Sequence, residues 1–179
     1  MNDCYRGTLS SYAYVLLCIY SLQNRSPPVL PALQSLRPHT FSLPHPTWPA
    51  AFFDDIAALR DFSAANGESL AELLVAFFDY WHRQHDWRSS VVSVRTGGLL
   101  HKGEKAWDRR VGSERHLMCI EDPFDLSHDL GRTMDSQTSG VLKQELSRAA
   151  RALLREPDAA VVMDSLFSRY TSSPAPPAK

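Results

Sequence analysis

Four acidic side chains and one histidine follow directly on a short apolar run in the stretch CIEDPFDLSHDLGRT, residues 119–133. The run ends at Ile120, the acids Glu121 and Asp122 come next, and Pro123 interrupts the backbone pattern. A histidine held beside carboxylates, as His128 is here, can be set in tautomer and charge, and it can read the edge of a nucleobase through one hydrogen bond. The alternative is a polar loop whose acids cap the next segment. The residues alone leave both interpretations open.

A second stretch, GTLSSYAY at residues 7–14, opens an expected helix with small hydroxyl residues. The N-terminus of a helix offers unpaired N–H groups and the positive end of the helix dipole, which suits phosphate groups. Tyr12 lies one turn in and can offer its ring to a nucleobase. The alternative is ordinary N-capping with a core tyrosine.

Metal ligation has weak support from the spacing of histidines and cysteines. His82 and His85 are three residues apart on an expected helix, and His116 and Cys119 have H-x-x-C spacing. Because no second matched pair accompanies either, we expect no metal site, with both helix histidines in solvent and Cys119 in the core. The sequence also contains no P-loop, GxSxG, GxGxxG or HExxH motif.

Two further groups of side chains have a nucleic-acid interpretation and a plainer one. The first is the local basic cluster, which we expect to be a solvated face, with a phosphate contact as the alternative. The second is an aromatic belt at helical spacing, which favours core packing over base stacking. The basic cluster is Lys102, Lys105, Arg109 and Arg110, and the belt is Phe77, Phe78, Tyr80, Trp81 and Trp87.

Composition excludes several classes of protein. The 179 residues are 44% apolar and 22% charged, and the net charge of -1 provides no global basic field for nucleic acid. Three cysteines without CxxC spacing predict free thiols in a reducing compartment. The apolar stretch 13–22 is shorter than a bilayer span and lacks a signal-peptide cleavage site, so it predicts a buried helix and no membrane association.

The patterns predict an α+β fold, mainly helical, with a small antiparallel hairpin. An all-apolar helix is expected from residues 8–11 to about 23, an extended loop over 37–49, and a short amphipathic helix over 52–62. Ser69 and Glu72 form a capping box before an apolar stripe that runs to Trp81 and predicts a core face. A hairpin over 91–100 and a helix over 139–155 follow. Residues 1–168 are expected to form one partial helical domain, and 169–179 a disordered tail.

Five ordered blocks give the chain a resemblance. GTLSSYAYVLLCIYSLQ with PPVLPALQ, then GESLAELLVAFFDYW, VVSVRTGGLLHKGEKAW and CIEDPFDLSHDLGRT resemble the C-terminal half of the non-canonical poly(A) polymerase and terminal uridylyltransferase family. The resemblance covers roughly residues 5–168, and its later blocks correspond to the PAP-associated region. Each block alone is a weak motif, but their order makes coincidence improbable.

The resemblance implies a role for four residues. Ser11 matches the family serine that contacts the triphosphate, and Tyr12 the tyrosine that stacks on the base. Asp122 matches the acid near the base edge, and His128 the histidine that favours uracil, which implies UTP rather than ATP. One departure is Asp129, where the family usually has asparagine. A negative charge there would raise the pKa of His128 or repel phosphate.

The resemblance also implies that the catalytic residues lie elsewhere. In the family, two magnesium ions on the carboxylates of a preceding nucleotidyltransferase domain act on the RNA 3' end. We expect that domain to be missing from this chain, because the sequence offers no D-x-D in a strand context. The acids Asp54-Asp55 and Glu121-Asp122 are adjacent, so on a strand their side chains would point to opposite faces. The chain alone is therefore expected to be inactive, with cytoplasm as the family's usual location. The alternatives are a non-catalytic binding module, or part of an adenylyl-transferring poly(A) polymerase.

Overall fold

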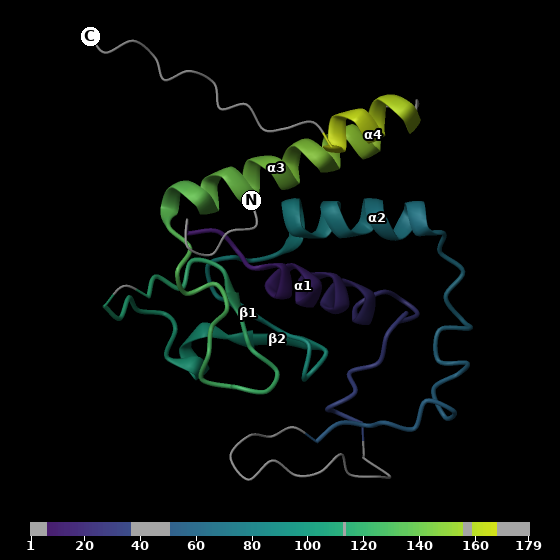
Figure 1. The fold of residues 1–179 in the computed structure, drawn as a ribbon, viewed down its shortest axis with the longest axis horizontal. Helices are drawn as coiled ribbons and strands as arrows, with labels where there is room; N and C mark the ends of the chain where they lie inside the picture. The colour runs from purple at the N-terminus through teal and green to yellow at the C-terminus, as the bar shows by residue number, and fades with distance from the viewer. Residues whose placement is uncertain (1–6, 37–50, 113, 156–158, 168–179) are drawn as a thin grey trace.

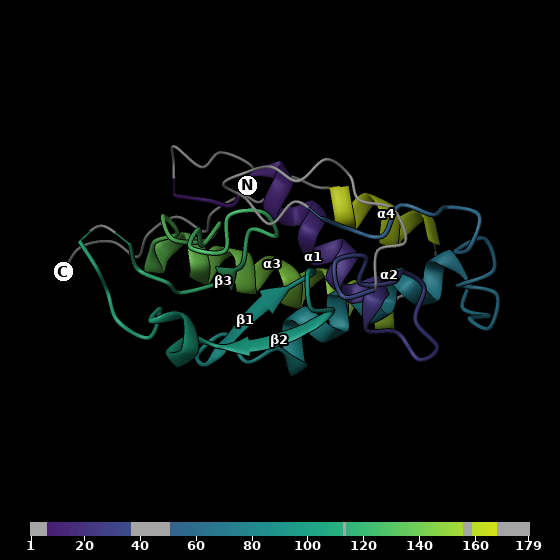
Figure 2. The same ribbon diagram turned by 90° about the horizontal axis from the view of Figure 1, so that it is seen from below.

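A computed structural model of the protein describes residues 7–36, 51–112, 114–155 and 159–167. Helix α3 lies along α2, with α1 on the other side of α2 and a small sheet beside them (Figures 1 and 2). One apolar core joins α1, the sheet and α3. The elements are α1 (Ser11–Gln23), α2 (Leu70–Asp79), a π-helical turn (Tyr80–Gln84), β1 (Ser90–Ser93), β2 (Gly98–His101), a 3-10 turn (Lys102–Lys105), β3 (Cys119–Ile120), α3 (Ser136–Arg155) and α4 (Ala159–Phe167).

Helix α1 has the boundaries that the sequence predicts. Ser10 is its N-cap, and the Ser10 hydroxyl accepts a hydrogen bond from the backbone N–H of Ala13 at 3.2 Å. Leu16 and Leu17 are buried in the core, whereas Val15 on the opposite face is 53% exposed. The helix is therefore apolar on a face that the described residues leave uncovered.

Helix α2 confirms the predicted capping box but not the full core stripe. The Ser69 hydroxyl accepts from Glu72 N, and the Glu72 carboxylate accepts from Ser69 N. No side chain of α2 itself is buried, and Leu70 is 83% exposed, while Trp81 in the following turn is 1% exposed. The prediction of a buried face is wrong for the start of α2, because α2 packs along α3 and the described residues leave its first turn open.

The sheet contains the predicted hairpin and one strand more. Val92 pairs with Leu99 in the antiparallel β1–β2 hairpin and with Ile120 of β3 in parallel. The sheet is therefore mixed, with the order β2-β1-β3, rather than purely antiparallel. The two residues of β3 are too short for a periodic signal, but they place the start of the 121–133 loop next to β1.

The helix predicted over 52–62 is wrong. Residues 56–65 form consecutive turns, in which Leu59 N donates to the carbonyl of Ile56 and Phe62 N to that of Leu59. Phe53 is buried, but Ile56 is 84% exposed, so no continuous apolar face stabilises a helix there. The sequence patterns also did not predict α4. The loop expected over 37–49 and the tail expected over 169–179 lie outside the described residues.

Helix α3 extends the predicted helix by one turn at its start, to Ser136. Its predicted apolar side is confirmed, since Leu142, Leu146, Ala149 and Ala150 are buried. In the described part of the chain, no helix is long and apolar enough to cross a bilayer.

Candidate nucleotide-binding site

The structure brings together the two segments that the sequence singles out. Ser11 and Tyr12 open α1 and are exposed, whereas Asp122 and His128 belong to the loop after β3 and are half-buried. Burial raises the pKa of Tyr12, and the nearby carboxylate of Asp122 raises it further. Asp122 is joined to the histidine, because its backbone N–H donates to the carbonyl of His128 at 3.1 Å. The four predicted residues therefore line one region of the surface.

The loop is built from short side-chain caps. One Asp122 oxygen accepts from the backbone N–H groups of Phe124 at 2.9 Å and Asp125 at 3.2 Å. Asp125 in turn accepts from the Ser127 hydroxyl at 2.7 Å, which lowers the pKa of Asp125, and His128 contributes to that shift. The capping role that the sequence offered as an alternative is thus confirmed, and it holds Asp122 and Asp125 near His128.

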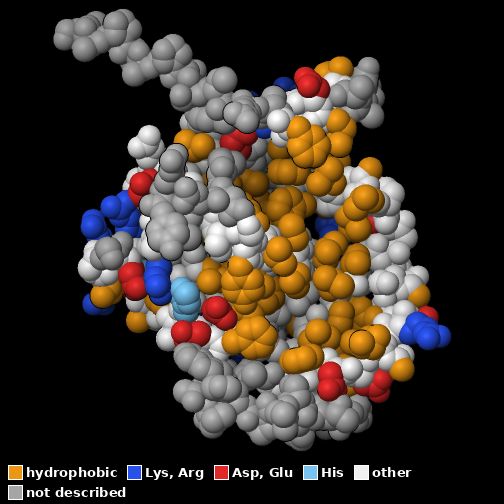
Figure 3. Space-filling model, viewed as in Figure 1, with side chains coloured by type: hydrophobic (Ala, Val, Ile, Leu, Met, Phe, Trp, Pro, Cys, Tyr) orange, Lys and Arg blue, Asp and Glu red, His pale blue; other side chains and the backbone are white. Residues whose placement is uncertain are grey.

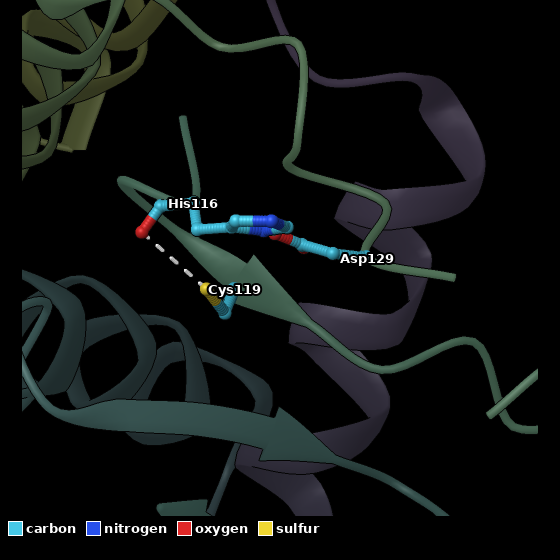
Figure 4. Close-up of side chains that lie close together, drawn as sticks. All are labelled: His116, Cys119 and Asp129. Carbon is cyan, nitrogen blue, oxygen red and sulfur yellow. Dashed lines mark hydrogen bonds and ion pairs between the residues drawn. The ribbon is translucent and has the colours of Figure 1, made fainter. Parts of the chain in front are cut away.

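Asp129 fastens both ends of this loop. Its Oδ1 accepts from the backbone N–H of Ile120 at 3.0 Å and of Gly131 at 2.8 Å. Its Oδ2 lies 2.7 Å from Nδ1 of His116, and the Asp129 side chain is fully buried (Figure 4). The negative charge of Asp129 therefore has a partner in the core. No local pattern in the sequence indicates this pair, because its members are 13 positions apart.

Gly131 allows the close approach on which this arrangement depends. A Cβ added to Gly131 would lie 1.8 Å from the carbonyl oxygen of Met118, far inside the van der Waals limit. The backbone of residue 131 therefore packs directly against the backbone of Met118, just before β3, where only glycine fits.

Glu121 ties the loop to the hairpin. Its buried carboxylate accepts from Ser93 Oγ at 2.6 Å, from Arg95 at 3.1 Å and from Lys105 at 2.8 Å. Burial alone would raise the pKa of Glu121, but these hydrogen bonds outweigh it, and the pKa is lowered. Lys105 also donates to the carbonyl of Leu126 inside the loop. The predicted solvated basic cluster is therefore wrong for Lys105, which is half-buried, and for Lys102, which is buried.

One set of potential metal ligands occurs in the described part of the chain, and it joins the H-x-x-C pair to Asp129. The ligand atoms of His116, Cys119 and Asp129 lie within 4.8 Å of one another (Figure 4). The Cys119 thiol donates to the carbonyl of His116, and its pKa is raised by burial and by Asp129. Lys102 donates to the same carbonyl at 2.6 Å. An ammonium already beside the group disfavours a second cation, so we interpret it as a hydrogen-bond network.

An apolar hollow of about 400 Å³ adjoins Tyr12. Val15 and Leu16 of α1 line one side, and Pro123 and Phe124 of the loop line another. The Gln34 side chain donates to the carbonyl of Pro123 at 2.8 Å and so connects residues 30–34 to the loop. Sequence reasoning missed Phe124 and Gln34. The exposed aromatic ring after a proline was a usable signal for Phe124, whereas nothing local marks Gln34.

Solved structures with this architecture are RNA terminal transferases. One is described as the structural basis for the activity of a cytoplasmic RNA terminal U-transferase, and it has a TM-score of 0.84 at 33% identity over 95% of this chain and 54% of that chain. A structure of the Cid1 poly(U) polymerase with Mg and 3'-dATP has a TM-score of 0.80 at 34% identity, over 93% and 50%. The fold is therefore that of one part of an RNA terminal nucleotidyltransferase.

Sequence comparisons identify the family. Residues 69–128 match the model of the Cid1 family poly A polymerases. Terminal uridylyltransferase cid1 of Schizosaccharomyces pombe is 35% identical over 188 residues, which are 99% of this chain and 45% of the relative. Poly(A) RNA polymerase cid11 of the same yeast is 34% identical over 147 residues, 82% of this chain and 29% of the relative. The chain belongs to this family and spans less than half the length of these curated relatives.

Proposed function

We propose that this chain is the base-recognising part of an RNA terminal uridylyltransferase, which adds uridine from UTP to RNA 3' ends. The observation that carries the proposal is the meeting of the α1 N-terminus with the 121–133 loop, where Tyr12 lies in the field of Asp122. Solved Cid1 structures contain the UTP analogue UMPNPP and the short product ApU, which supports a nucleotide and an RNA end as ligands of the family.

Each of the four residues has a physical role in this proposal. Ser11 and the first backbone N–H groups of α1 receive the phosphates at the positive end of the helix dipole. The Tyr12 ring, 40% exposed, stacks on the base. Asp122 and His128 hydrogen-bond to the edge of the base, and the histidine side chain leaves room for uracil rather than adenine. The Asp122 turn and the Asp129 fastening hold that edge in place.

Magnesium enters the proposal through a nucleotidyltransferase domain in a longer protein. In this chain Glu121 is buried in ion pairs with Arg95 and Lys105, and Asp129 is buried in a hydrogen bond with His116. Asp122 and Asp125 accept hydrogen bonds from backbone N–H groups of the loop. These acids therefore offer no pair of carboxylates free to hold the ions jointly. We assign the metal-dependent transfer step to that domain and expect this chain to be inactive alone.

Helix α1 has an apolar face that the described residues leave exposed, which supports our proposal that another domain packs against it. Apolar side chains gather over the face on which α1 lies (Figure 3), and Val15 is 53% exposed there. An apolar patch of this kind beside a candidate site is typical of a domain interface. We propose that the nucleotidyltransferase domain covers it, which would close the nucleotide between the two. We also propose a cytoplasmic location, supported by the relative described as a cytoplasmic RNA terminal U-transferase.

Transfer of adenosine is the second candidate function, because cid11, a poly(A) RNA polymerase, is 34% identical to this chain. The two candidates differ in which base the loop accepts. His128→Asn separates them, because in the uridylyl case it should relax the preference for UTP, whereas an adenylyl-transferring protein has no such preference to lose.

The proposal is tested by titrating the ¹⁵N-labelled chain with UTP and with ATP in magnesium, following amide shifts by NMR. We expect UTP to shift amides in two segments, residues 11–13 and 122–132, at lower concentration than ATP. Tyr12→Ala should weaken UTP binding about tenfold, in line with roughly 1–3 kcal/mol per stacked base. Cys18→Ala, at an exposed position of the same helix that does not line the hollow, is the matched control and should bind normally. A folded chain whose shifts lie elsewhere, or show no difference between the nucleotides, would contradict the proposal.

A further inference from the structure

The structure contains a second cleft, of about 770 Å³, and none of the four candidate nucleotide-site residues lines it. Its walls are the segment after the π-helical turn, the end of β2, the residues before β3 and the start of α3. We call it the tryptophan cleft, after its aromatic walls and the cations around them: Trp87, Arg88, Lys102, Trp107, Arg115 and Lys143.

Three of its cations form no close ion pair. Arg88, Arg115 and Lys143 make none with any residue that the structure describes, although the charge of Arg115 contributes to the lowered pKa of Asp135. Lys143 extends over Trp87, with its Nζ 6.0 Å from the ring centroid. Unpaired cations that converge on one concave surface attract an anionic ligand.

The cleft also contains two acids and a buried lysine. Asp86 accepts hydrogen bonds from the Ser89 hydroxyl and from the backbone N–H of Arg88, and Asp108 lies 4.0 Å from Arg109. Lys102 is buried and donates to the carbonyls of Trp87 at 2.9 Å and His116 at 2.6 Å. Lys102 therefore forms a rigid, positively charged floor, and the three outer cations remain available to a ligand.

His85 supplies a second observation that points to a ligand. Contrary to the sequence expectation of a solvated histidine, its side chain is packed between Trp81 and Trp87, and the residue is only 7% exposed. Nδ1 lies 3.3 Å from the Tyr80 hydroxyl, while Nε2 is buried and has no hydrogen-bond partner among the residues that the structure describes. Buried polar atoms are nearly always paired, so an unpaired nitrogen in the wall of a basic cleft indicates a bound group that completes it.

We infer that the tryptophan cleft binds single-stranded RNA, with phosphates at Arg88, Arg115 and Lys143 and a base against Trp87. Aromatic faces beside a basic groove are the usual means of holding single strands without reading their sequence. The inference rests on the proposed function for the identity of the ligand as RNA. It adds a place for the strand at a distance from the nucleotide that is being added.

The test measures binding of a fluorescein-labelled 15-nucleotide RNA by anisotropy at several salt concentrations. The cleft double variant, Arg88→Ala with Lys143→Ala, removes two of the proposed phosphate contacts. The control double variant, Arg60→Ala with Arg155→Ala, removes the same amount of positive charge from outside the cleft. We expect the cleft double variant to weaken binding about tenfold and to reduce the slope of log K against log salt by about 1.4, at roughly 0.7 per contact. The control double variant should change binding less than about twofold.

UTP binding, followed in parallel through the amides of residues 11–13, separates this inference from the proposed function. If the cleft double variant and the control double variant lose RNA binding equally, the inference about the cleft is overturned and the proposed nucleotide site is not. The same holds if the folded chain binds UTP but no RNA. RNA binding that depends on the cleft in a chain that ignores UTP would support the cleft and contradict the nucleotide site. His85→Phe, which keeps an aromatic ring packed at this position, should weaken RNA binding a few-fold. If His85→Phe does not fold, the comparison of the cleft double variant with the control double variant still tests the inference.

Discussion

Replacing Asp129 tests whether one buried carboxylate holds the candidate nucleotide loop. In Asp129→Ala three donors lose their acceptor: the backbone N–H groups of Ile120 and Gly131, and the Nδ1 atom of His116. An unpaired buried donor costs about 1–3 kcal/mol. Allowing for relaxation of the loop, we expect the free energy of unfolding to fall by about 3–6 kcal/mol, measured by urea unfolding with circular dichroism.

Asp129→Asn separates the charge from the shape. The amide oxygen can still accept from Ile120 and Gly131, but the amide nitrogen then faces His116 Nδ1, which must accept a hydrogen bond. The loss in Asp129→Asn should therefore be about 1–2 kcal/mol, smaller than the loss in Asp129→Ala, because two of the three donors keep an acceptor.

The groups around His116 define the control for this experiment. Glu114 lies 3.6 Å from Nε2, Trp107 stacks on the ring, and Lys102 and the Cys119 thiol donate to the backbone carbonyl. All are unchanged in the variant, so their contributions cancel in the comparison with the wild type. Asp125→Asn, which changes a loop acid outside the buried pair, should lower the free energy of unfolding by less than about 1 kcal/mol. A loss below about 1 kcal/mol for Asp129→Ala, or equal losses for Asp129→Ala and Asp129→Asn, would refute the reasoning.

Three further predictions follow. Glu121→Gln leaves Arg95 and Lys105 without their buried counter-charge, and urea unfolding should show a loss of about 3–5 kcal/mol, against little change for Glu104→Gln at an exposed position. Gly131→Ala should unfold the loop or the chain because its Cβ would meet Met118 O at 1.8 Å, whereas Gly140→Ala, with no atom within 4 Å, should raise the melting temperature through about 0.5–1 kcal/mol of helix propensity. Burial lowers the pKa of His85 to about 4, so as the pH falls His85 becomes protonated in the unfolded chain before it does in the folded chain. The free energy of unfolding is therefore unaffected by this group above about pH 6.5, and it should fall by about 2 kcal/mol by pH 5 in the wild type. His85→Phe should not show this loss. Equal slopes of stability against pH in the two proteins would contradict the last prediction.

Local signals in the sequence predicted the regular elements well. The Ser69–Glu72 capping box marks the start of α2, and the hydroxyl residues before Tyr12 mark the start of α1. Both signals consist of hydrogen bonds between residues at most three positions apart, so the sequence alone contains them. The apolar stripe of α3 is likewise a local pattern. The failure over 52–62 shows the limit of such patterns, since a short amphipathic stretch needs a surface to pack on.

The sequence suggested four candidate site residues, but not the contacts that hold their loop in place. The resemblance pointed to Ser11, Tyr12, Asp122 and His128, which the structure brings to one region. The support comes from contacts between residues far apart in the sequence: Glu121 with Ser93 across 28 positions, and Gln34 with Pro123 across 89. No periodicity in one sequence encodes these distances. For the same reason the sequence did not show that Lys102 and His85 are buried.

The central claim, that this chain selects uracil for transfer, is tested most directly by RNA extension. The chain would be mixed with the nucleotidyltransferase domain of a family member, magnesium, an RNA primer and equal UTP and ATP, with each part alone as a control. The account predicts uridine addition only in the mixture, and a shift toward adenosine when His128→Asn replaces the wild type. Extension that prefers ATP with the wild-type chain, or a preference for UTP that His128→Asn leaves unchanged, would contradict it.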